Sequence, residues 1–362
     1  MIPSDRIGIR VAIGLLIGCL FFNLSAQQAN YTLSPLPIPL TGLSGMVYPD
    51  DIYIFGGRDA SGTFYSSTQH QLHCNACGWT PRSPMPTPRA FATAVKVTSG
   101  TLNGMTLVIG GKNGFGALNT VEAYNPANDT WITLPPMAFQ RSNLKATSLN
   151  GNIHVFGGFN GLNVLNVHEI FNTSTLSWSI APPMPSSLMD FGIATLTELG
   201  TDYAYIFGGR THPTNVNSIV ATNTRYDPVL QSYASRAPMP IARAAFGSTS
   251  DNYLFHRLYA YGGYTNPGGP MTDSIHKYEI GNNSWEAHGF VLAAPAAEFW
   301  GQGFWDARTT CAFNLITIGG RTSSGLLTGD GRSYYVQSGP WAIANDEFYG
   351  SSSVKAIDLT WS

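Results

Sequence analysis

The sequence predicts an all-β protein assembled from six repeats of four strands, and three observations carry this prediction. The 362-residue chain holds 39 glycines, which is about 11% against an average near 7%. Aromatic residues reach 12% while charged residues make up only 11%, less than half the usual share of about 25%. Hydrophobic residues still amount to 43%, which allows a large core and argues against a disordered chain. The third observation is a pair of markers that recur six times.

The first marker is a Gly-Gly pair that ends a short apolar strand. Successive pairs are separated by 54, 47, 51, 54 and 57 residues. Self-similarity at such a period is typical of repeat folds. Glycine allows a positive φ or a close backbone approach where a Cβ would clash. The pairs begin at Gly56, Gly110, Gly157, Gly208, Gly262 and Gly319.

The second marker is a large apolar residue followed seven positions later by an aromatic residue. Turn residues such as Asn125–Asp129 lie between the two, so each pair predicts a hairpin. Proline clusters then end the strand that begins at the aromatic residue. The six pairs are Leu72/Trp79, Tyr124/Trp131, Phe171/Trp178, Tyr226/Tyr233, Tyr278/Trp285 and Tyr334/Trp341.

A strand of small residues follows each proline cluster and supplies the fourth strand of the repeat. Examples are Ala90–Val97 and Ala244–Thr249. The Asn-Gly pairs at 103–104 and 150–151 predict tight hairpins from this strand into the Gly-Gly strand. In the sixth repeat we expect the small-residue strand around Cys311, after the aromatic segment Trp300–Trp305, with Cys311 as a buried free thiol.

This pattern resembles the kelch-repeat family, which includes the central domain of galactose oxidase, from about residue 31 to 341. The resemblance implies a six-bladed β-propeller, in which four-stranded sheets surround a central channel. We assign residues 27–341 to the propeller and residues 342–362 to a C-terminal tail or closing segment. Residues 31–37 repeat the pattern of the Trp131 strand, so we expect this first segment to pair with the last repeat and close the ring.

Residues 1–26 read as a secretory signal peptide. Arg6 and Arg10 precede the apolar run Val11–Phe22, and Ala26 offers a small residue for cleavage. The run is too short to span a bilayer core of about 30 Å. Two alternatives are an uncleaved anchor and a lipid attached at Cys19. We therefore expect a secreted chain, extracellular or periplasmic, with no transmembrane segment in the mature protein.

Basic residues recur at two positions of the repeat: the start of the small-residue strand and the residue after Gly-Gly. Both positions fall on one face of a blade, so the sequence predicts a ring of cations at one mouth of the channel. Such a ring suits an anionic ligand, such as an acidic glycan, a carboxylated sugar or an acidic peptide. The eight residues are Arg58, Arg89, Lys112, Arg141, Arg210, Arg243, Arg308 and Arg321.

Two alternatives stand beside that hypothesis. The resemblance implies that an arginine at the start of the small-residue strand bonds loop carbonyls, which is a structural role. The same loops also carry acidic residues that would neutralise the ring, namely Asp59, Asp190, Glu298 and Asp306.

Two further motifs fit an oxidising compartment. Cys74 and Cys77 flank a predicted turn, where we expect a disulfide; a local metal site with His70 and His73 is the alternative, and no metal is expected. Glycosylation sequons occur at four asparagines, three of them in turns on the face opposite the cation ring. Chance occurrence in polar turns is the alternative. The sequons are at Asn30, Asn128, Asn172 and Asn282.

The predicted function is a binding or adhesion module for an extracellular carbohydrate or protein. A net charge of −2 without a basic run argues against nucleic acid, and no motif calls for a cofactor. The resemblance also covers enzymes, among them copper-radical oxidases and sialic-acid mutarotases. The alternative is therefore a small sugar-active enzyme such as a mutarotase, with Glu298 or Asp190 acting beside Arg141 or Arg243. A pure scaffold subunit ranks third.

Overall fold

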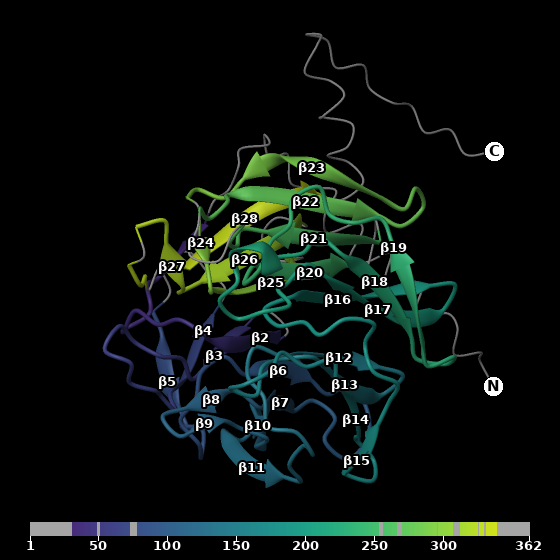
Figure 1. The fold of residues 1–362 in the computed structure, drawn as a ribbon. Helices are drawn as coiled ribbons and strands as arrows, with labels where there is room; N and C mark the ends of the chain where they lie inside the picture. The colour runs from purple at the N-terminus through teal and green to yellow at the C-terminus, as the bar shows by residue number, and fades with distance from the viewer. Residues whose placement is uncertain are drawn as a thin grey trace, which may run out of the picture.

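The fold is a closed ring of four-stranded antiparallel sheets. The computed structural model describes residues 31–48, 51–72, 78–252, 256–265, 270–294, 296–306, 312–324, 326–328 and 331–338. Their strands form six such sheets, or blades (Figure 1). The first strand of each blade lies against the first strand of the next, and β2 lies against β25. The predicted six-bladed β-propeller is confirmed. Within the described residues, no helix is long and apolar enough to cross a membrane.

Blades 1 to 3 occupy the first half of the propeller. Blade 1 contains β2 (Ser44–Tyr48), β3 (Asp51–Phe55), β4 (Thr68–Leu72) and β5 (Thr80–Arg82). Blade 2 contains β6 (Thr93–Lys96), β7 (Thr106–Ile109), β10 (Val121–Asn125) and β11 (Thr130–Leu134). Blade 3 contains β12 (Lys145–Leu149), β13 (Asn152–Phe156), β14 (His168–Asn172) and β15 (Ser177–Ile180).

Blades 4 to 6 complete the ring. Blade 4 contains β16 (Gly192–Glu198), β17 (Thr201–Phe207), β18 (Asn223–Asp227) and β19 (Ser232–Arg236). Blade 5 contains β20 (Gly247–Asp251), β21 (Arg257–Tyr261), β22 (Ser274–Glu279) and β23 (Ser284–Val291). Blade 6 contains β25 (Trp300–Asp306), β26 (Ala312–Ile318), β28 (Gly331–Ser338) and β1 (Tyr31–Leu33). Short pairs β8–β9 (Lys112–Asn113 with Gly116–Ala117) and β24–β27 (Ala296–Ala297 with Arg321–Thr322) extend two loops.

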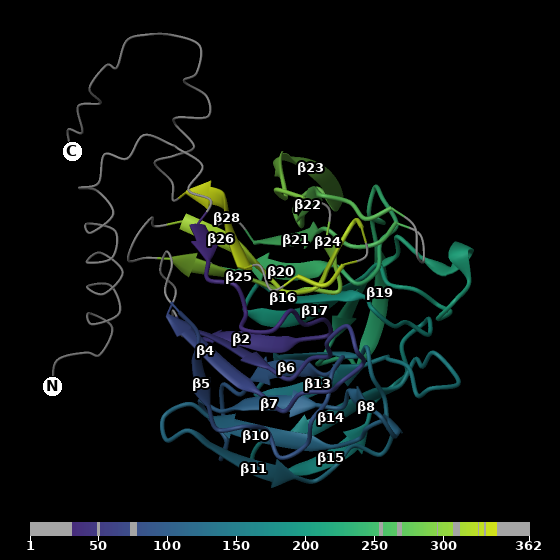
Figure 2. The ribbon, with the colours of Figure 1, turned by 90° about the vertical axis from the view of Figure 1, so that its left-hand side faces the viewer.

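The ring closes as predicted, because the N-terminal strand completes the last blade. β1 pairs with β28, with Tyr31 opposite Ser333 and Leu33 opposite Gly331, and the two strands lie side by side in Figure 2. Leu33 is buried in a cluster that also contains Ile316 of blade 6. This pairing covers the edge that β28 would otherwise leave unpaired.

The start of blade 6 differs from the prediction. Its first strand is β25, not a segment around Cys311. A Cβ on Gly301 would come within 2.7 Å of the Tyr261 hydroxyl, so a small residue is required at this position. The aromatic residues on either side of Gly301 make the segment look unlike a small-residue strand in the sequence. Arg308 and Cys311 lie outside the described residues, as do the segments 1–30, Cys74–Cys77 and 339–362.

The aromatic markers join neighbouring blades. In blades 2 to 5 the two members of a marker pair are direct cross-strand partners, as Tyr124 and Trp131 are, which confirms the predicted hairpin there. In blade 1 the strand register is offset by one residue from the pair Leu72/Trp79. Trp341 lies outside the described residues, and β1 is the fourth strand of blade 6. The Trp131 Nε1–H donates to the Ser83 carbonyl of the preceding blade at 2.8 Å. Trp178 and Trp285 make the same bond to a preceding blade. The large rings therefore fill the gap between neighbouring blades, and their N–H groups hydrogen-bond the two blades together.

Blade 4 has a tyrosine where blades 1, 2, 3 and 5 have tryptophan, and this tyrosine contacts a linked pair of buried histidines from blade 3. The Tyr233 hydroxyl lies 2.9 Å from Nδ1 of His168, whose Nε2 lies 3.0 Å from Nδ1 of His154. Burial lowers the pKa of His154 to about 4 and that of His168 to about 2. Both rings are therefore neutral near pH 7 and act as packing groups.

The Gly-Gly pair holds the beginning of the next blade. Gly110 has φ +63°, and a Cβ there would lie 2.6 Å from the Arg141 carbonyl oxygen. The next amide, that of Gly111, donates to the same carbonyl at 2.9 Å. Only glycine allows this approach, which brings the residue after each pair to the channel mouth.

Candidate functional site: the mouth of the central channel

Six residues, one from the start of each blade, form a closed ring of backbone hydrogen bonds at one end of the channel. Each has a left-handed φ between +54° and +65°. Each N–H donates to the carbonyl of its counterpart in the neighbouring blade, over N···O distances of 2.7 to 3.4 Å. This axial ring ties the six blades together and points six side-chain positions at one cavity. Its members are Gly42, Phe91, Asn143, Asp190, Ala245 and Glu298.

A second set of six residues follows the Gly-Gly pairs and stands around the axial ring. Each is bridged to the residue that precedes the ring member of its own blade. All of them except Tyr264 line, with the axial ring and Lys145, a cavity of about 280 Å³. The set consists of Arg58, Lys112, Phe159, Arg210, Tyr264 and Arg321.

On one side of this cavity the charges neutralise each other. The Arg210 guanidinium contacts Oδ2 of Asp190 at 2.6 Å through Nη2 and at 2.8 Å through Nε. The Arg321 Nε donates to Oε2 of Glu298 at 2.9 Å. Tyr264 also donates to that carboxylate, at 3.2 Å. We call these two pairs, from blades 4 and 6, the paired side of the mouth.

The other side carries cations without carboxylate partners. Among the described residues, neither Arg58, Lys112 nor Lys145 forms an ion pair. The Lys112 Nζ lies 4.7 Å from the centre of the Phe91 ring, and the Arg58 Cζ lies 5.9 Å from it. We call these three residues, from blades 1 to 3, the cationic side.

Burial makes the cationic side receptive to an anion. It lowers the pKa of Lys112, and the charge of Arg58 lowers it further, against a smaller opposing effect of Asp190 and Glu298. Burial likewise lowers the pKa of Lys145, against a smaller opposing effect of Asp190. The Arg58 Nε is buried with no hydrogen-bond partner among the described residues. An anion would supply the missing acceptor and relieve the repulsion between these cations.

Three of the predicted mouth residues lie elsewhere, so the prediction is wrong for them. Arg89, Arg141 and Arg243 are at most 1% exposed, and each donates hydrogen bonds to groups of both the second and the third strand of its own blade. Arg89 contacts Glu122 at 2.5 Å and Arg141 contacts Glu169 at 2.6 Å. These arginines hydrogen-bond groups inside their own blades, which is the structural role given above as an alternative. They contribute no charge to the mouth.

Comparison with known proteins agrees with this architecture. The family model of the KLHDC2/KLHL20/DRC7 Kelch-repeats domain matches residues 20–209. The chain belongs to the kelch-repeat family. The solved structure of YjhT resembles this kelch propeller with a TM-score of 0.66 and 20% identity, over 83% of this chain and 95% of YjhT; at this identity the likeness supports the fold alone. The search of curated proteins finds no match.

The kelch propeller therefore brings together part of the predicted site. Arg58, Lys112, Arg210 and Arg321 meet at the mouth, and the expected neutralising carboxylates Asp190 and Glu298 are there with them. Asp59 instead bonds within its own loop, to Ser61 and Tyr65. Sequence reasoning missed Lys145, whose only signal is a charged residue at the start of a small-residue strand. The side chains of Arg308 and Asp306 lie outside the described set.

The remaining motifs lie away from the mouth or outside the described residues. Asn128 and Asn282 lie in turns between third and fourth strands, and Asn172 is the last residue before such a turn, at the end of the blade opposite the mouth. Asn128 and Asn282 are exposed, and their glycosylation stays a prediction. The sequon at Asn30, the cysteines Cys19, Cys74 and Cys77, and the signal segment fall outside the description. Among described residues, no group of three or more metal-ligating side chains occurs.

Proposed function

We propose that this kelch propeller is a secreted binding module whose mouth takes the anionic group of an extracellular glycan or protein. The observation that carries the proposal is the cationic side: Arg58, Lys112 and Lys145 border the mouth cavity, with no carboxylate paired to any of them among the described residues. Secretion rests on the signal segment 1–26.

The two sides of the mouth favour different parts of one ligand. Arginine and lysine that are partly removed from water attract a carboxylate or sulfate more strongly than exposed ones do. The opposite carboxylates of Asp190 and Glu298 are already paired, and their oxygens accept hydrogen bonds from hydroxyl or amide donors. A cavity of about 280 Å³ lies just below the range of about 300–1,000 Å³ that is usual for ligand pockets, which limits the group it takes to a small one. A sugar that carries one acidic group and several hydroxyls meets both requirements.

An array of matched ligands tests this proposal from the ligand side. Each carboxylated or sulfated glycan is printed beside its neutral parent, and acidic peptides beside their amide counterparts, with the full chain as the probe. We expect binding to acidic members only, and a fall in binding as sodium chloride is raised. Equal retention of a neutral parent and its acidic form contradicts the proposal.

One observation favours a second candidate, a small sugar-active enzyme of the mutarotase kind. Glu298 lies in the mouth cavity beside Arg321 and receives the Tyr264 hydroxyl, although we expected its partner to be Arg141 or Arg243. The Tyr264 hydroxyl lies 3.2 Å from the Glu298 carboxylate, which is within the reach that general acid–base catalysis requires. NMR exchange between sugar anomers measures this activity. If it exists, Glu298→Gln lowers the rate about 100-fold or more; no acceleration by the unsubstituted chain excludes it.

A further inference from the structure

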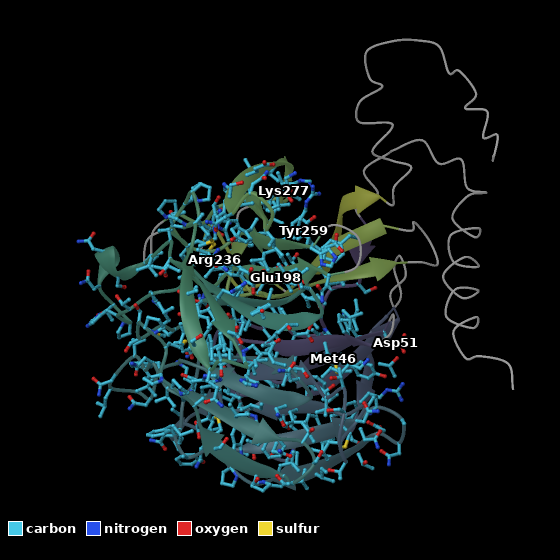
Figure 3. The ribbon with its side chains drawn as sticks, turned by 90° about the vertical axis from the view of Figure 1, so that its right-hand side faces the viewer. Met46, Asp51, Glu198, Arg236, Tyr259 and Lys277 are labelled. Carbon is cyan, nitrogen blue, oxygen red and sulfur yellow. The ribbon has the colours of Figure 1, made fainter. Side chains whose placement is uncertain are left out.

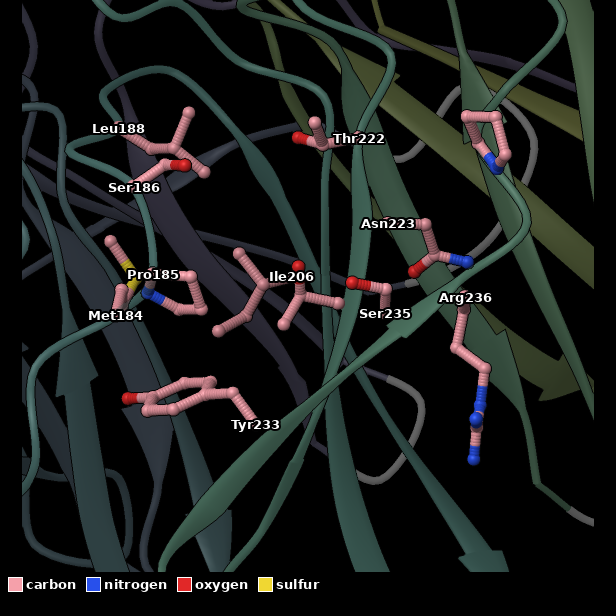
Figure 4. A pocket seen from close by; sticks show the side chains of 12 residues that line it. Met184, Pro185, Ser186, Leu188, Ile206, Thr222, Asn223, Tyr233, Ser235 and Arg236 are labelled. Carbon is pink, nitrogen blue, oxygen red and sulfur yellow. The ribbon is translucent and has the colours of Figure 1, made fainter.

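A second cavity opens in the side of blade 4, apart from the mouth. Its volume is about 220 Å³ (Figure 4). It lies between the segment that leads into the blade and strands β17 to β19. The residues that matter for its chemistry are Met184, Leu188, Ile206, Thr222, Asn223 and Thr224.

In blade 3 the corresponding place is filled by an arginine of the chain itself. Arg141 donates to the carbonyls of Gly157, Val167 and Val155 at 2.9, 3.0 and 3.5 Å, and to Glu169 at 2.6 Å. Its Nη2 also lies 3.6 Å from the sulfur of Met137. These groups form a cage around one guanidinium.

Blade 4 keeps the cage but lacks the arginine. Leu188 takes the position of Arg141, because each carbonyl accepts the second glycine amide of the preceding blade. The strand registers place Thr224 at the position of Glu169, since each lies opposite the residue two before its own Gly-Gly pair. By the same alignment Met184, Ile206 and Thr222 replace Met137, Val155 and Val167. All five counterparts line the cavity, which is therefore the vacated guanidinium site.

Blade 5 demonstrates that this cage holds a guanidinium without a carboxylate. Arg243 is fully buried there. It donates to the carbonyls of Ala260, Gly262 and Ser274, and its Nη2 contacts Nδ1 of His276 at 2.7 Å. Burial, followed by the charge of Arg243, lowers the pKa of His276 to about 4, so this histidine is neutral near pH 7 and accepts the bond.

A buried acceptor in the blade 4 cavity has no donor. Asn223 is 3% exposed, and its Nδ2 donates to the Ala237 carbonyl at 3.2 Å. Its Oδ1 is buried and has no hydrogen-bond partner among the described residues. Figure 4 shows this oxygen turned toward Ser235 and Ile206, on the cavity side. A buried acceptor of this kind costs about 1–3 kcal/mol unless a donor reaches it.

We propose that the blade 4 cavity binds a guanidinium group supplied from outside the chain. Its N–H groups would donate to Asn223 Oδ1 and to the hydroxyl oxygens of Thr222 and Thr224, while its faces pack against Met184 and the ring of Tyr233. The source is either a free guanidino compound or the arginine side chain of a peptide. This site is independent of the ligand proposed for the mouth.

Arg236 is the charged residue among those that line the cavity, and its guanidinium is directed elsewhere. It interacts with the Tyr205 hydroxyl, which also donates to Glu198 at 2.5 Å. Figure 3 shows Arg236 and Glu198 near one another, and in Figure 4 the Arg236 side chain runs away from Leu188 and Met184. The charge of Arg236 is thus held toward Glu198, outside the cage.

Titration of the full chain with matched probes tests the proposal. N-acetyl-L-arginine methylamide and methylguanidinium are compared with N-acetyl-L-lysine methylamide by NMR or calorimetry. We expect saturable binding of the guanidinium probes and at least about tenfold weaker binding of the lysine probe, because an ammonium lacks the planar set of donors. Arginine amide alone binding points to a peptide source, and equal binding of methylguanidinium points to a free compound. No saturable binding, or equal binding of the lysine probe, overturns the proposal.

Two variants localise the effect. Leu188→Arg with Thr224→Glu rebuilds the pair that blades 2 and 3 contain, so we expect a folded chain whose cavity is filled and whose guanidinium binding is lost. Thr224→Glu alone supplies the carboxylate without the arginine, and we expect it to tighten binding about tenfold or more. If the rebuilt variant folds and still binds the probe, or if Thr224→Glu leaves affinity unchanged, the cavity is not the site. Thr224→Glu alone tests whether the probe binds in this cavity even if the double variant does not fold.

Discussion

The two sides of the channel mouth share one framework and differ in their charge. On both sides a cation follows Gly-Gly and stands beside a member of the axial ring. Where that member is Asp190 or Glu298, the cation is paired. Where it is Gly42 or Phe91, the cation has no carboxylate partner among the described residues. The residue in the axial ring therefore decides whether a blade contributes free charge to the mouth.

The closure strand joins these two sides, since β1 completes blade 6 and leads into blade 1 (Figures 1 and 2). Deleting residues 27–40 removes the buried Leu33, Leu36 and Leu40, each worth about 2–5 kcal/mol in a core. We expect this to lower the melting temperature by more than about 10 °C. Circular dichroism or calorimetry measures it.

A matched pair of point variants separates the stabilising effect of ring closure from the effect of shortening the chain. Leu36→Ala should lower the melting temperature by several degrees, whereas Ile38→Ala, in the same segment but 40% exposed, should have a much smaller effect. Unchanged melting of the deletion variant would contradict the closure of the ring through β1.

A carboxylate introduced on the cationic side should form ion pairs with the cations there, as the carboxylates of the paired side do. Phe91 has φ +58° and Glu298 has φ +56°, so a glutamate is tolerated in this backbone conformation. Phe91→Glu places a carboxylate beside Lys112 and Arg58, and we expect the affinity for an acidic ligand to fall about 30-fold, which is equivalent to about 2 kcal/mol. Calorimetry with a ligand from the array measures this.

The control for that variant is Phe91→Gln, which removes the same aromatic ring without adding charge. We expect it to lose only the packing and cation–π contribution, about 1 kcal/mol or less. If the glutamine and glutamate variants lose the same affinity, the difference between the two sides does not arise from pairing.

Acid should weaken the boundary between the two sides, where blade 3 meets blade 4 through His154, His168 and Tyr233. The folded pKa values of about 4 and about 2 lie below the ordinary 6.5, so the unfolded chain binds more protons below pH 6.5. Stability is therefore complete above pH 6.5 and falls as pH drops toward 4, by at most about 1.4 kcal/mol per pH unit for each histidine. Denaturant titrations at pH 7, 6 and 5 measure the slope.

Replacing one histidine at a time identifies the source of that slope. His154→Gln should reduce the slope to about half, because His168 still contributes, whereas His212→Gln, at an exposed histidine, should leave it unchanged. A slope that is the same in all three chains would show that the buried pair does not control acid stability.

Repeated features were predictable from the sequence, and features set by side-chain direction were not. The Gly-Gly pairs predicted Arg58, Lys112, Arg210 and Arg321 at the mouth, because a repeated backbone conformation requires the same residue each time. Arg89 recurs just as regularly with its counterparts, but whether it faces the channel or the blade interior depends on strand register. Its partner Glu122, buried within an apolar strand, was the available signal.

Other parts of the site are formed by positions that do not share a residue type, so the sequence shows no repeat there. The axial ring combines Gly42, Phe91, Asn143 and Asp190 in one left-handed conformation, and these residues have no shared chemistry. Lys145 lies in the site because it begins β12, whereas the first strands of the other blades begin with uncharged residues. The blade 4 cavity arises from the absence of an arginine, which becomes visible only when the blades are aligned in space.

The most direct test of the account compares two charge-changing variants of the mouth. Arg58→Gln with Lys112→Gln removes two free cations, and Arg210→Gln with Asp190→Asn removes one neutral pair. Affinity for an acidic ligand from the array is measured by calorimetry for both and for the unsubstituted chain. The account predicts a loss of about 100-fold or more for the first variant and a change within about threefold for the second. Equal losses in the two variants, or a larger loss in the second, would contradict it.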